Sequence, residues 1–360
     1  MNLFLLLGTG FYFCFVVLIF SGLLFRKKIN NIDHNLPKVS VVMAARNEEK
    51  NISFILDDLV NQSIDKNNFE ILIANDRSDD TTGEIIDQYA SDYTFIKTIH
   101  IYNKTNMAPK KYALTQAIEN SSGEIIVATD ADCRVSKDWV KSMALLVQNT
   151  GKVVIGYSKI DSSNTLDQYQ KIDFLGIMAA NGGLLTHGIV SSGSGQNLAY
   201  TKEDFYAING FEPVKEHISG DDMYIVQKIS LLRGAIFNYD PHSFVSTLPK
   251  ESIKGYFNQR IRWSSNSKFT LNTSPLFFGF LLSAFFANCC ILFSIIFYPV
   301  LSSFLIMIKF FLEAFVIFIG SRLFLTKVSP FAYIIWSLTQ PIYIPIVGIA
   351  GLIGKYSWKE

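Results

Sequence analysis

The sequence predicts an α/β protein in which a doubly wound sheet lies between membrane-spanning helices at the two ends of the chain. In residues 38–130, short aliphatic runs alternate with polar loops and amphipathic helical stretches, which is the element order of a doubly wound sheet. A charge-free run covers residues 2–25, and residues 276–325 are almost continuously apolar. One aliphatic run, residues 125–128, is followed directly by two acids, Asp130 and Asp132.

Composition agrees with this division of the chain. At 360 residues the chain is long enough for one large α/β domain with additional segments, and its net charge of +1 argues against nucleic acid as a partner. A hydrophobic content of 49% and a mean hydropathy of +0.25 are high for a soluble enzyme. The excess lies at the two ends, so we expect an ordinary soluble domain between them.

The four cysteines indicate a reducing environment. Cys14, Cys133, Cys289 and Cys290 show no spacing typical of a zinc site or a disulfide framework, and three of them lie in apolar segments. The simplest interpretation is a catalytic domain that faces the cytoplasm.

Residues 1–28 are expected to form an N-terminal transmembrane anchor. The apolar run is long enough to span the hydrocarbon core and is followed by Arg26-Lys27-Lys28. A cleaved signal peptide would place its basic residues before the apolar run. The basic cluster favours a cytoplasmic location for the end of the anchor, so we expect an integral, multi-pass membrane protein with a cytoplasmic catalytic domain.

Residues 38–250 are expected to form that domain. The first strand begins at Lys38 and leads to a helix over 50–62, whose apolar face carries Ile52, Ile55, Leu56 and Leu59. A second strand over 69–74 ends on Asn75-Asp76, and a third unit places a helix from Pro109 to about Asn120. The following hundred residues are less regular.

Asp130 and Asp132 are the first candidate site. Side chains at i and i+2 on an extended backbone share a face, and open α/β sheets bind ligands at the carboxyl ends of their strands. Two hard oxygen ligands there suit Mg²⁺ or Mn²⁺, which can hold a diphosphate. The alternative is a pair of solvated turn acids.

Asp221 and Asp222 are the second candidate site, because they open a helix whose apolar face carries Met223, Ile225, Val226 and Ile229. Acids at a helix N-terminus also have a structural explanation as cap and first-turn residues.

The C-terminal third is predicted to be membrane-associated. Residues 251–273 mix aromatic and basic side chains, as in an amphipathic helix at the membrane surface. Residues 276–353 are expected to contribute two or three transmembrane segments, broken near Pro299. The last segment, 331–353, is interrupted by Pro341 and Pro345, so a re-entrant segment is the alternative to a full crossing. Lys309 and Glu313, at i and i+4, are expected to form an internal ion pair, with a role near a lipid acceptor as the alternative.

Four sequence motifs follow one another in this chain. The first two are Arg46-Asn47-Glu48, after the first strand, and the strand that ends on Asp76. The third is Asp130-Ala131-Asp132, and the fourth is Asp221-Asp222, followed by Gln259-Arg260-Ile261-Arg262-Trp263. In this order they resemble a membrane-bound family 2 glycosyltransferase, with its D-x-D, E/D-D and Q-x-x-R-W motifs. The resemblance covers roughly residues 38–268. It implies a Rossmann-like mixed sheet of the A-type glycosyltransferase fold.

The resemblance also assigns donor-binding residues. Asp76 would contact the base or ribose, although Asn75-Asp76-Arg77-Ser78 stands where the family usually has D-D-G-S. Lys110 would neutralise a phosphate, with Pro109 in place of the family's glycine; a solvated lysine at a helix start is the alternative. The remaining donor-binding positions are Ala45, Asn47, Glu48 and Asp130.

By the same resemblance, Asp130 and Asp132 would hold a divalent ion and the diphosphate, and Asp222 would be the general base, with Asp221 in the place of the family's Glu. His242 is a candidate for a further metal ligand, and a solvated loop histidine is the alternative. The Q-x-x-R-W motif would serve the diphosphate and the acceptor through Gln259, Arg262 and Trp263; membrane anchoring is the alternative function of this helix.

We therefore expect an inverting transfer of a sugar from a nucleotide sugar, most simply a UDP-sugar, to a lipid-linked or polysaccharide acceptor. A processive polysaccharide synthase is the alternative within the same class. A non-catalytic membrane scaffold with a retained transferase fold is the alternative from another class, and the presence of Asp130, Asp132 and Asp222 argues against it.

Overall fold

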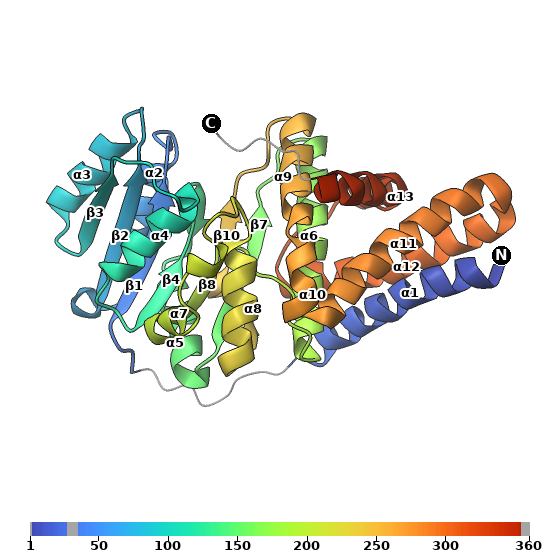
Figure 1. The fold of residues 1–360 in the computed structure, drawn as a ribbon, viewed down its shortest axis with the longest axis horizontal. Coiled ribbons are helices and arrows are strands. Elements are labelled where there is room, and N and C mark those ends of the chain that lie inside the picture. Colours follow the sequence, from blue (N-terminus) through green and yellow to red (C-terminus); the bar gives the residue numbers. More distant parts are fainter. Residues whose placement is uncertain (1, 27–34, 354–360) are drawn as a thin grey trace. The chain divides into compact units, whose positions relative to one another are not determined.

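A computed structural model describes residues 2–26 and 35–353, and the chain divides into two compact units (Figure 1). The sheet unit consists of residues 28–159 and 192–248, and the helical unit of residues 1–27, 160–191 and 249–360. Lys27 and Lys28, which enter the expected orientation of the anchor, lie outside the described residues.

The sheet unit is built on a seven-stranded sheet of order β3-β2-β1-β4-β8-β6-β9. Strands β3, β2, β1 and β4 are parallel, whereas β8 pairs antiparallel with both β4 and β6, so the predicted mixed sheet is confirmed. The strands of this sheet are β1 (Val39–Ala45), β2 (Phe69–Asp76), β3 (Ile96–Ile101), β4 (Ile125–Ala128), β6 (Val153–Gly156), β8 (Leu198–Thr201) and β9 (Ala235–Asn238).

A second, three-stranded sheet has the order β5-β10-β7, from β5 (Cys133–Val135), β7 (Ser158–Ile160) and β10 (Val245–Thr247). The helices of the sheet unit are α2 (Ile52–Val60), α3 (Thr82–Asp92), α4 (Pro109–Glu119), α5 (Trp139–Thr150), α7 (Lys202–Ala207) and α8 (Asp221–Arg233), with short 3₁₀ turns at Lys66–Asn68, Glu212–Val214 and Pro241–Ser243.

Apolar periodicity located the main core elements correctly. The predicted face of α2 is buried against the sheet, and so is the predicted apolar face of α8. Helix α4 begins at Pro109, where the ring of a first-turn proline removes a donor that would have no helical partner.

One expectation about β4 is wrong. The strand ends at Ala128, and Ala131 and Asp132 lie in a turn before β5. Asp130 and Asp132 therefore do not share the face of one extended strand. They follow the carboxyl end of β4 on a turn, so the argument from strand alternation does not apply to them.

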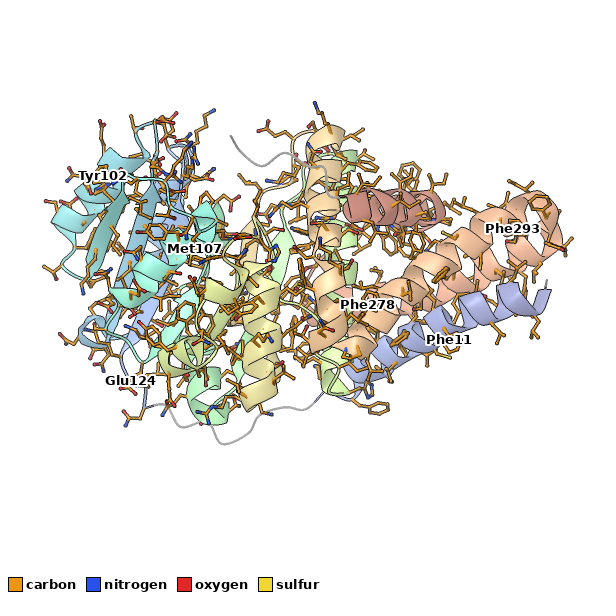
Figure 2. All side chains as sticks on the ribbon, viewed as in Figure 1. Phe11, Tyr102, Met107, Glu124, Phe278 and Phe293 are labelled. Carbon is orange, nitrogen blue, oxygen red and sulfur yellow. The ribbon has the colours of Figure 1, made fainter. Side chains whose placement is uncertain are left out.

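The helical unit contains four helices that are long and apolar enough to cross a membrane: α1 (Asn2–Leu24, with the apolar span from Leu5), α11 (Pro275–Phe297), α12 (Pro299–Leu323) and α13 (Pro330–Ile353). Their outward faces are strongly apolar. Figure 2 labels Phe11 on α1 and Phe293 on α11, and both side chains are exposed. The expected break at Pro299 separates α11 from α12.

The same unit holds α6 (Thr165–Thr186), α9 (Ile253–Ser265), a 3₁₀ turn at Ser267–Phe269 and the short α10 (Thr270–Thr273). Helix α6 lies in the hundred residues for which the sequence pattern predicted no regular elements. It begins with a capping box, in which the Asn164 side chain accepts from the Asp167 backbone N–H and the Asp167 carboxylate accepts in return from the Asn164 N–H.

The expected ion pair in α12 is confirmed. Lys309 Nζ lies 2.8 Å from Glu313, and Tyr12 of α1 donates its hydroxyl to the same carboxylate at 2.5 Å. All three groups are buried. Lys309 and Tyr12 thus both stabilise the buried carboxylate of Glu313.

Helices α1 and α6 pack so closely that a side chain would not fit between them. A Cβ added at Gly22 would lie 2.0 Å from the backbone oxygen of Gly183, whereas a Cβ at Gly10 of the same helix would meet nothing within 4 Å.

We expect Gly22→Ala to lower the free energy of unfolding by about 1–3 kcal/mol, because the added methyl group forces the helices apart. Gly10→Ala is the matched control and should be neutral or slightly stabilising, since alanine favours the helix. Thermal unfolding of the detergent-purified proteins, followed by tryptophan fluorescence, measures both. Equal melting temperatures for Gly22→Ala and wild type would contradict the close packing.

Candidate active site

The carboxyl ends of three neighbouring parallel strands bring the predicted donor-binding residues to one edge of the sheet. Ala45 ends β1, Asp76 ends β2 and Asp130 follows β4, and β1 lies between the other two strands. In an open α/β sheet this edge is where ligands bind.

The loops after β1 and β2 are connected by hydrogen bonds. The Asn47 side-chain oxygen accepts from the Asp79 backbone N–H at 2.9 Å, and the Asn47 N–H donates to the Ser78 hydroxyl at 3.1 Å. The Glu48 N–H donates to the Thr82 hydroxyl at 2.8 Å. These bonds fix the backbone of the predicted nucleotide-binding loop before any ligand arrives.

Asp76 is buried, and its carboxylate carries a partner that the sequence did not indicate. Arg77 Nε lies 2.7 Å from Asp76 Oδ1. The backbone of Arg77 has φ = 52°, a left-handed conformation that favours glycine, and this is the position at which the resembling family has glycine. The chain thus keeps the backbone shape of that loop with an arginine, and the guanidinium is placed on the carboxylate expected to read the base or ribose.

A second cluster gathers around Lys110, at the start of α4. Its Nζ lies 2.7 Å from Asp130 and 3.5 Å from Asp221. Burial lowers the pKa of Lys110, but Asp130 and Asp221 outweigh burial and raise it above its ordinary value. Lys110 is therefore a permanent cation among carboxylates, as binding of a phosphate group requires.

Asp221 and Asp222 form the first turn of α8, as predicted, after Gly220 with φ = 81°. The Asp222 carboxylate accepts from the backbone N–H groups of Met223 at 2.7 Å and Gly195 at 3.2 Å. Burial and the neighbouring Asp221 raise the pKa of Asp222 to about 6, while Lys110 and these two N–H groups lower it. A carboxylate with that pKa can accept a proton near neutral pH.

Gly195 has a position that the sequence did not single out for function. A Cβ there would lie 3.4 Å from Lys110 Nζ and 3.5 Å from Asp221 Oδ2. These are ordinary van der Waals distances, so the backbone at Gly195 borders the charged cluster, and its N–H donates to Asp222.

Lys111, the residue after Lys110, is buried and has a structural role instead. Its Nζ donates to the carbonyl oxygens of His217 and Ser219, the latter at 3.0 Å. It thereby holds the loop that leads into Asp221. The two adjacent lysines thus have different partners: Lys110 forms ion pairs with the acids, and Lys111 donates to backbone carbonyl groups.

No three His, Cys, Asp or Glu side chains in residues 2–26 and 35–353 come close enough to form a metal site by themselves. His242, exposed on the Pro241–Ser243 turn, has Nδ1 3.6 Å from Asp138. Asp132 is half-buried on the turn after β4, two residues beyond Asp130. A Mg²⁺ or Mn²⁺ ion can be bound through only one or two protein carboxylates when substrate phosphate and water supply its other ligands.

Gln259, Arg262 and Trp263 lie on α9 in the helical unit, whereas the acids lie in the sheet unit. Within the motif, the buried residue is Arg260. Its Nε lies 2.7 Å from Asp173 of α6, and its guanidinium lies 4.2 Å from the centre of the Trp263 ring. Its Nη1 donates to Gln259 at 2.8 Å. The intervening arginine thus fixes two of the predicted acceptor-site residues.

Comparison with known proteins agrees with this arrangement. Residues 40–208 match the family described as Glycosyl transferase family 2. The chain is 27% identical over 241 residues to a probable glycosyltransferase, YdaM, of Bacillus subtilis, covering 66% of this chain and 56% of that protein. It is 26% identical over 240 residues to a poly-beta-1,6-N-acetyl-D-glucosamine synthase of Staphylococcus aureus, covering 65% and 55%. The chain thus spans about half the length of these relatives.

Among solved structures, the mannosyltransferase PcManGT of Pyrobaculum calidifontis, in complex with GDP-Man and Mn²⁺, has a TM-score of 0.67 at 18% identity, with 97% of this chain and 98% of that one covered. That likeness concerns the fold, and it confirms the expected A-type glycosyltransferase architecture. The family match and the relatives agree: residues 40–208 are similar in sequence to glycosyl transferase family 2.

Proposed function

We propose that this nucleotide-sugar transferase inverts the configuration of the sugar that it transfers and that Asp222 is its general base. The observation that carries the proposal is the cluster of Lys110, Asp130, Asp221 and Asp222 at the ligand-binding edge of the sheet. It combines a fixed cation for phosphate with a carboxylate whose pKa is near 6.

On this proposal the donor is held in two parts. The nucleoside lies against Ala45, Asn47, Glu48 and Asp76, on the loops that hydrogen bonds already hold together. The diphosphate lies near Lys110, Asp130 and Asp132, whose charges suit an ion-bound phosphate. A divalent ion held by Asp130 and Asp132 would stabilise negative charge on the leaving diphosphate.

The acceptor hydroxyl would then be deprotonated by Asp222 as its oxygen attacks the sugar, in a single displacement that inverts the anomeric centre. The Gly195 N–H and the α8 N-terminus orient the Asp222 carboxylate for this step. Gln259, Arg262 and Trp263 would serve the acceptor and the departing diphosphate.

We propose a lipid-linked or other membrane acceptor, used at the cytoplasmic face. Support for the cytoplasmic face comes from Arg26, just after α1, and support for a membrane acceptor comes from the four apolar helices among the described residues. Polysaccharide synthesis is the second candidate, because one relative is a polysaccharide synthase.

Membranes carrying the protein should release nucleoside diphosphate from one member of a panel of UDP- and GDP-sugars. Both nucleotides belong in the panel because Arg77 departs from the family's pattern at the expected base site.

Turnover should fall as the pH drops below about 6, where Asp222 becomes protonated. Asp222→Asn should lower turnover by about 10²–10⁴-fold while donor affinity stays near wild type. Undiminished turnover in that variant would rule out Asp222 as the base.

The two adjacent lysines offer a matched pair. Lys110→Met should reduce turnover by about 10²–10³-fold, because a preorganised cation is lost at the phosphate site. Lys111→Met should instead lower the melting temperature, because two buried carbonyl groups lose their donor at a cost of about 1–3 kcal/mol. Both variants lose one positive charge, so a common loss of turnover with unchanged stability would contradict the division of roles.

The metal proposal is tested by titrating the donor's nucleoside diphosphate with and without Mn²⁺. Wild type should bind more tightly with the ion, and Asp132→Ala should lose most of that difference, since Lys110 still attracts phosphate without it. His242→Ala is the control: we expect it to keep the metal dependence, because His242 has Asp138 as its neighbour. Equal affinities under all conditions would remove the metal site.

A further inference from the structure

Contacts of α13 define its path within the helical unit. Three other helices mark one end of the bundle. Helix α1 ends beside α6 at Gly22, and α12 passes α6 at Gly320, near its own last residue. Helix α11 begins after Ser274, whose hydroxyl donates to the carbonyl of Val190 just beyond α6. We call this the α6 end of the bundle. Figure 1 shows α1, α11 and α12 running side by side away from α6.

Helix α13 has 24 residues and is long and apolar enough to cross a membrane. If it did so, its first turns would lie at the α6 end and its last turns at the opposite end, beside the junction of α11 and α12 at Tyr298. Contacts with α6 and α9 would then be confined to one part of the helix.

The observed contacts with α6 and α9 instead recur along its length. Trp336 Nε1 donates to Asp173 at 3.2 Å. The Thr339 and Tyr169 hydroxyls lie 2.9 Å apart, and those of Tyr343 and Tyr256 3.0 Å apart.

The contacts continue to the last turn. A Cβ at Gly351 would lie 2.5 Å from the Ser264 hydroxyl oxygen, near the end of α9. From Trp336 to Gly351 a helix rises about 22 Å, so α13 follows α6 and α9 over most of its length.

Both ends of α13 are therefore connected to the α6 end. Its first residue, Pro330, follows shortly after Leu323, the last residue of α12. Its last turn packs on Ser264, and the chain continues from there through α10 to the start of α11 at Pro275. A segment that starts and finishes at the same end of a bundle does not cross to the other end.

The middle of α13 lies deepest. Ser337 and Pro341 line a cavity of about 70 Å³ together with Lys309, which is near the middle of α12. Pro341 and Pro345 interrupt the hydrogen bonds of α13 in this region, and proline is a common cause of a bend in a helix.

The two faces of α13 differ. The buried face carries polar and aromatic groups with partners on α6, α9 and α12, including Trp336 and Tyr333, whose hydroxyl donates to the Phe310 carbonyl at 2.5 Å. The other face carries a stripe of exposed apolar side chains at helical spacing, Phe331, Ile334, Leu338, Ile342, Ile346 and Ile349, of which Leu338 and Ile342 also border the cavity beside α11 and α12. An aliphatic surface of this kind fits the acyl chains of a lipid leaflet.

We propose that α13 is a re-entrant membrane segment: it enters one leaflet beside α6 and α9, places its apolar stripe against the acyl chains of that leaflet, and brings its last turn back to the side on which α12 ends. Neither the transfer reaction nor the absolute orientation of the protein enters this inference.

The test compares three positions in the full chain. Short epitope tags are placed singly between Tyr298 and Pro299, in the loop after Thr326, and after Glu360. Proteolysis of the tags in sealed vesicles of one orientation, with opened vesicles as the control, reports their sides. The tags after Thr326 and Glu360 should share one side, and the tag at Tyr298 should lie on the other. A tag after Glu360 on the same side as the Tyr298 tag would overturn the proposal, whichever way the vesicles face.

Insertions can disturb folding, so a second measurement uses depth. Single spin labels at Ile334, Ile342 and Ile349, all on the exposed stripe, are compared by quenching from either aqueous side. A re-entrant segment should show all three labels nearer to the side of α6, with the middle one deepest. A steady progression toward the opposite side would indicate a spanning helix and contradict the proposal.

Discussion

The positive charge of Lys110 is the interaction on which the arrangement of the candidate site depends. Asp130 approaches it from the end of β4 and Asp221 from the start of α8, so one side chain connects two halves of the site that are 91 residues apart in sequence. Without a cation between them, these carboxylates would repel one another. The alternative of a solvated lysine at a helix start is not what the structure shows.

The helical unit also contains a carboxylate that needs partners because it is buried. Asp173 is buried and accepts from Arg260, Tyr256 and Trp336, which lie on α9 and α13. Removing one partner of such a buried pair costs several kcal/mol because the remaining charge is left uncompensated. Asp173 thus ties α6, α9 and α13 together, so the helix that carries the Q-x-x-R-W motif is held by a carboxylate on a different element.

Sequence patterns predicted the elements whose buried residues recur periodically. They missed the elements that depend on contacts between residues far apart in the sequence. The faces of α2 and α8 and the apolar helices follow from 3.6-residue periodicity. Helix α6 buries Gln170, Asp173 and Asn181 among its apolar residues, so it shows no clean apolar stripe. The signal that could have located its start is the capping box at Asn164 and Asp167. The end of β4 depends on pairing with β1 and β8, which no local pattern contains.

The same distinction applies within the site. The acids could be predicted because their types and order are specific, but Gly195, Lys111 and the Arg77–Asp76 pair act through neighbours that are distant in sequence or through an unusual backbone angle.

The cluster also couples the two parts of the proposed reaction. Lys110 lowers the pKa of Asp222 and is, on our proposal, the group that meets the diphosphate. On our proposal, the charge that attracts the diphosphate therefore also helps to set the proton affinity of the base.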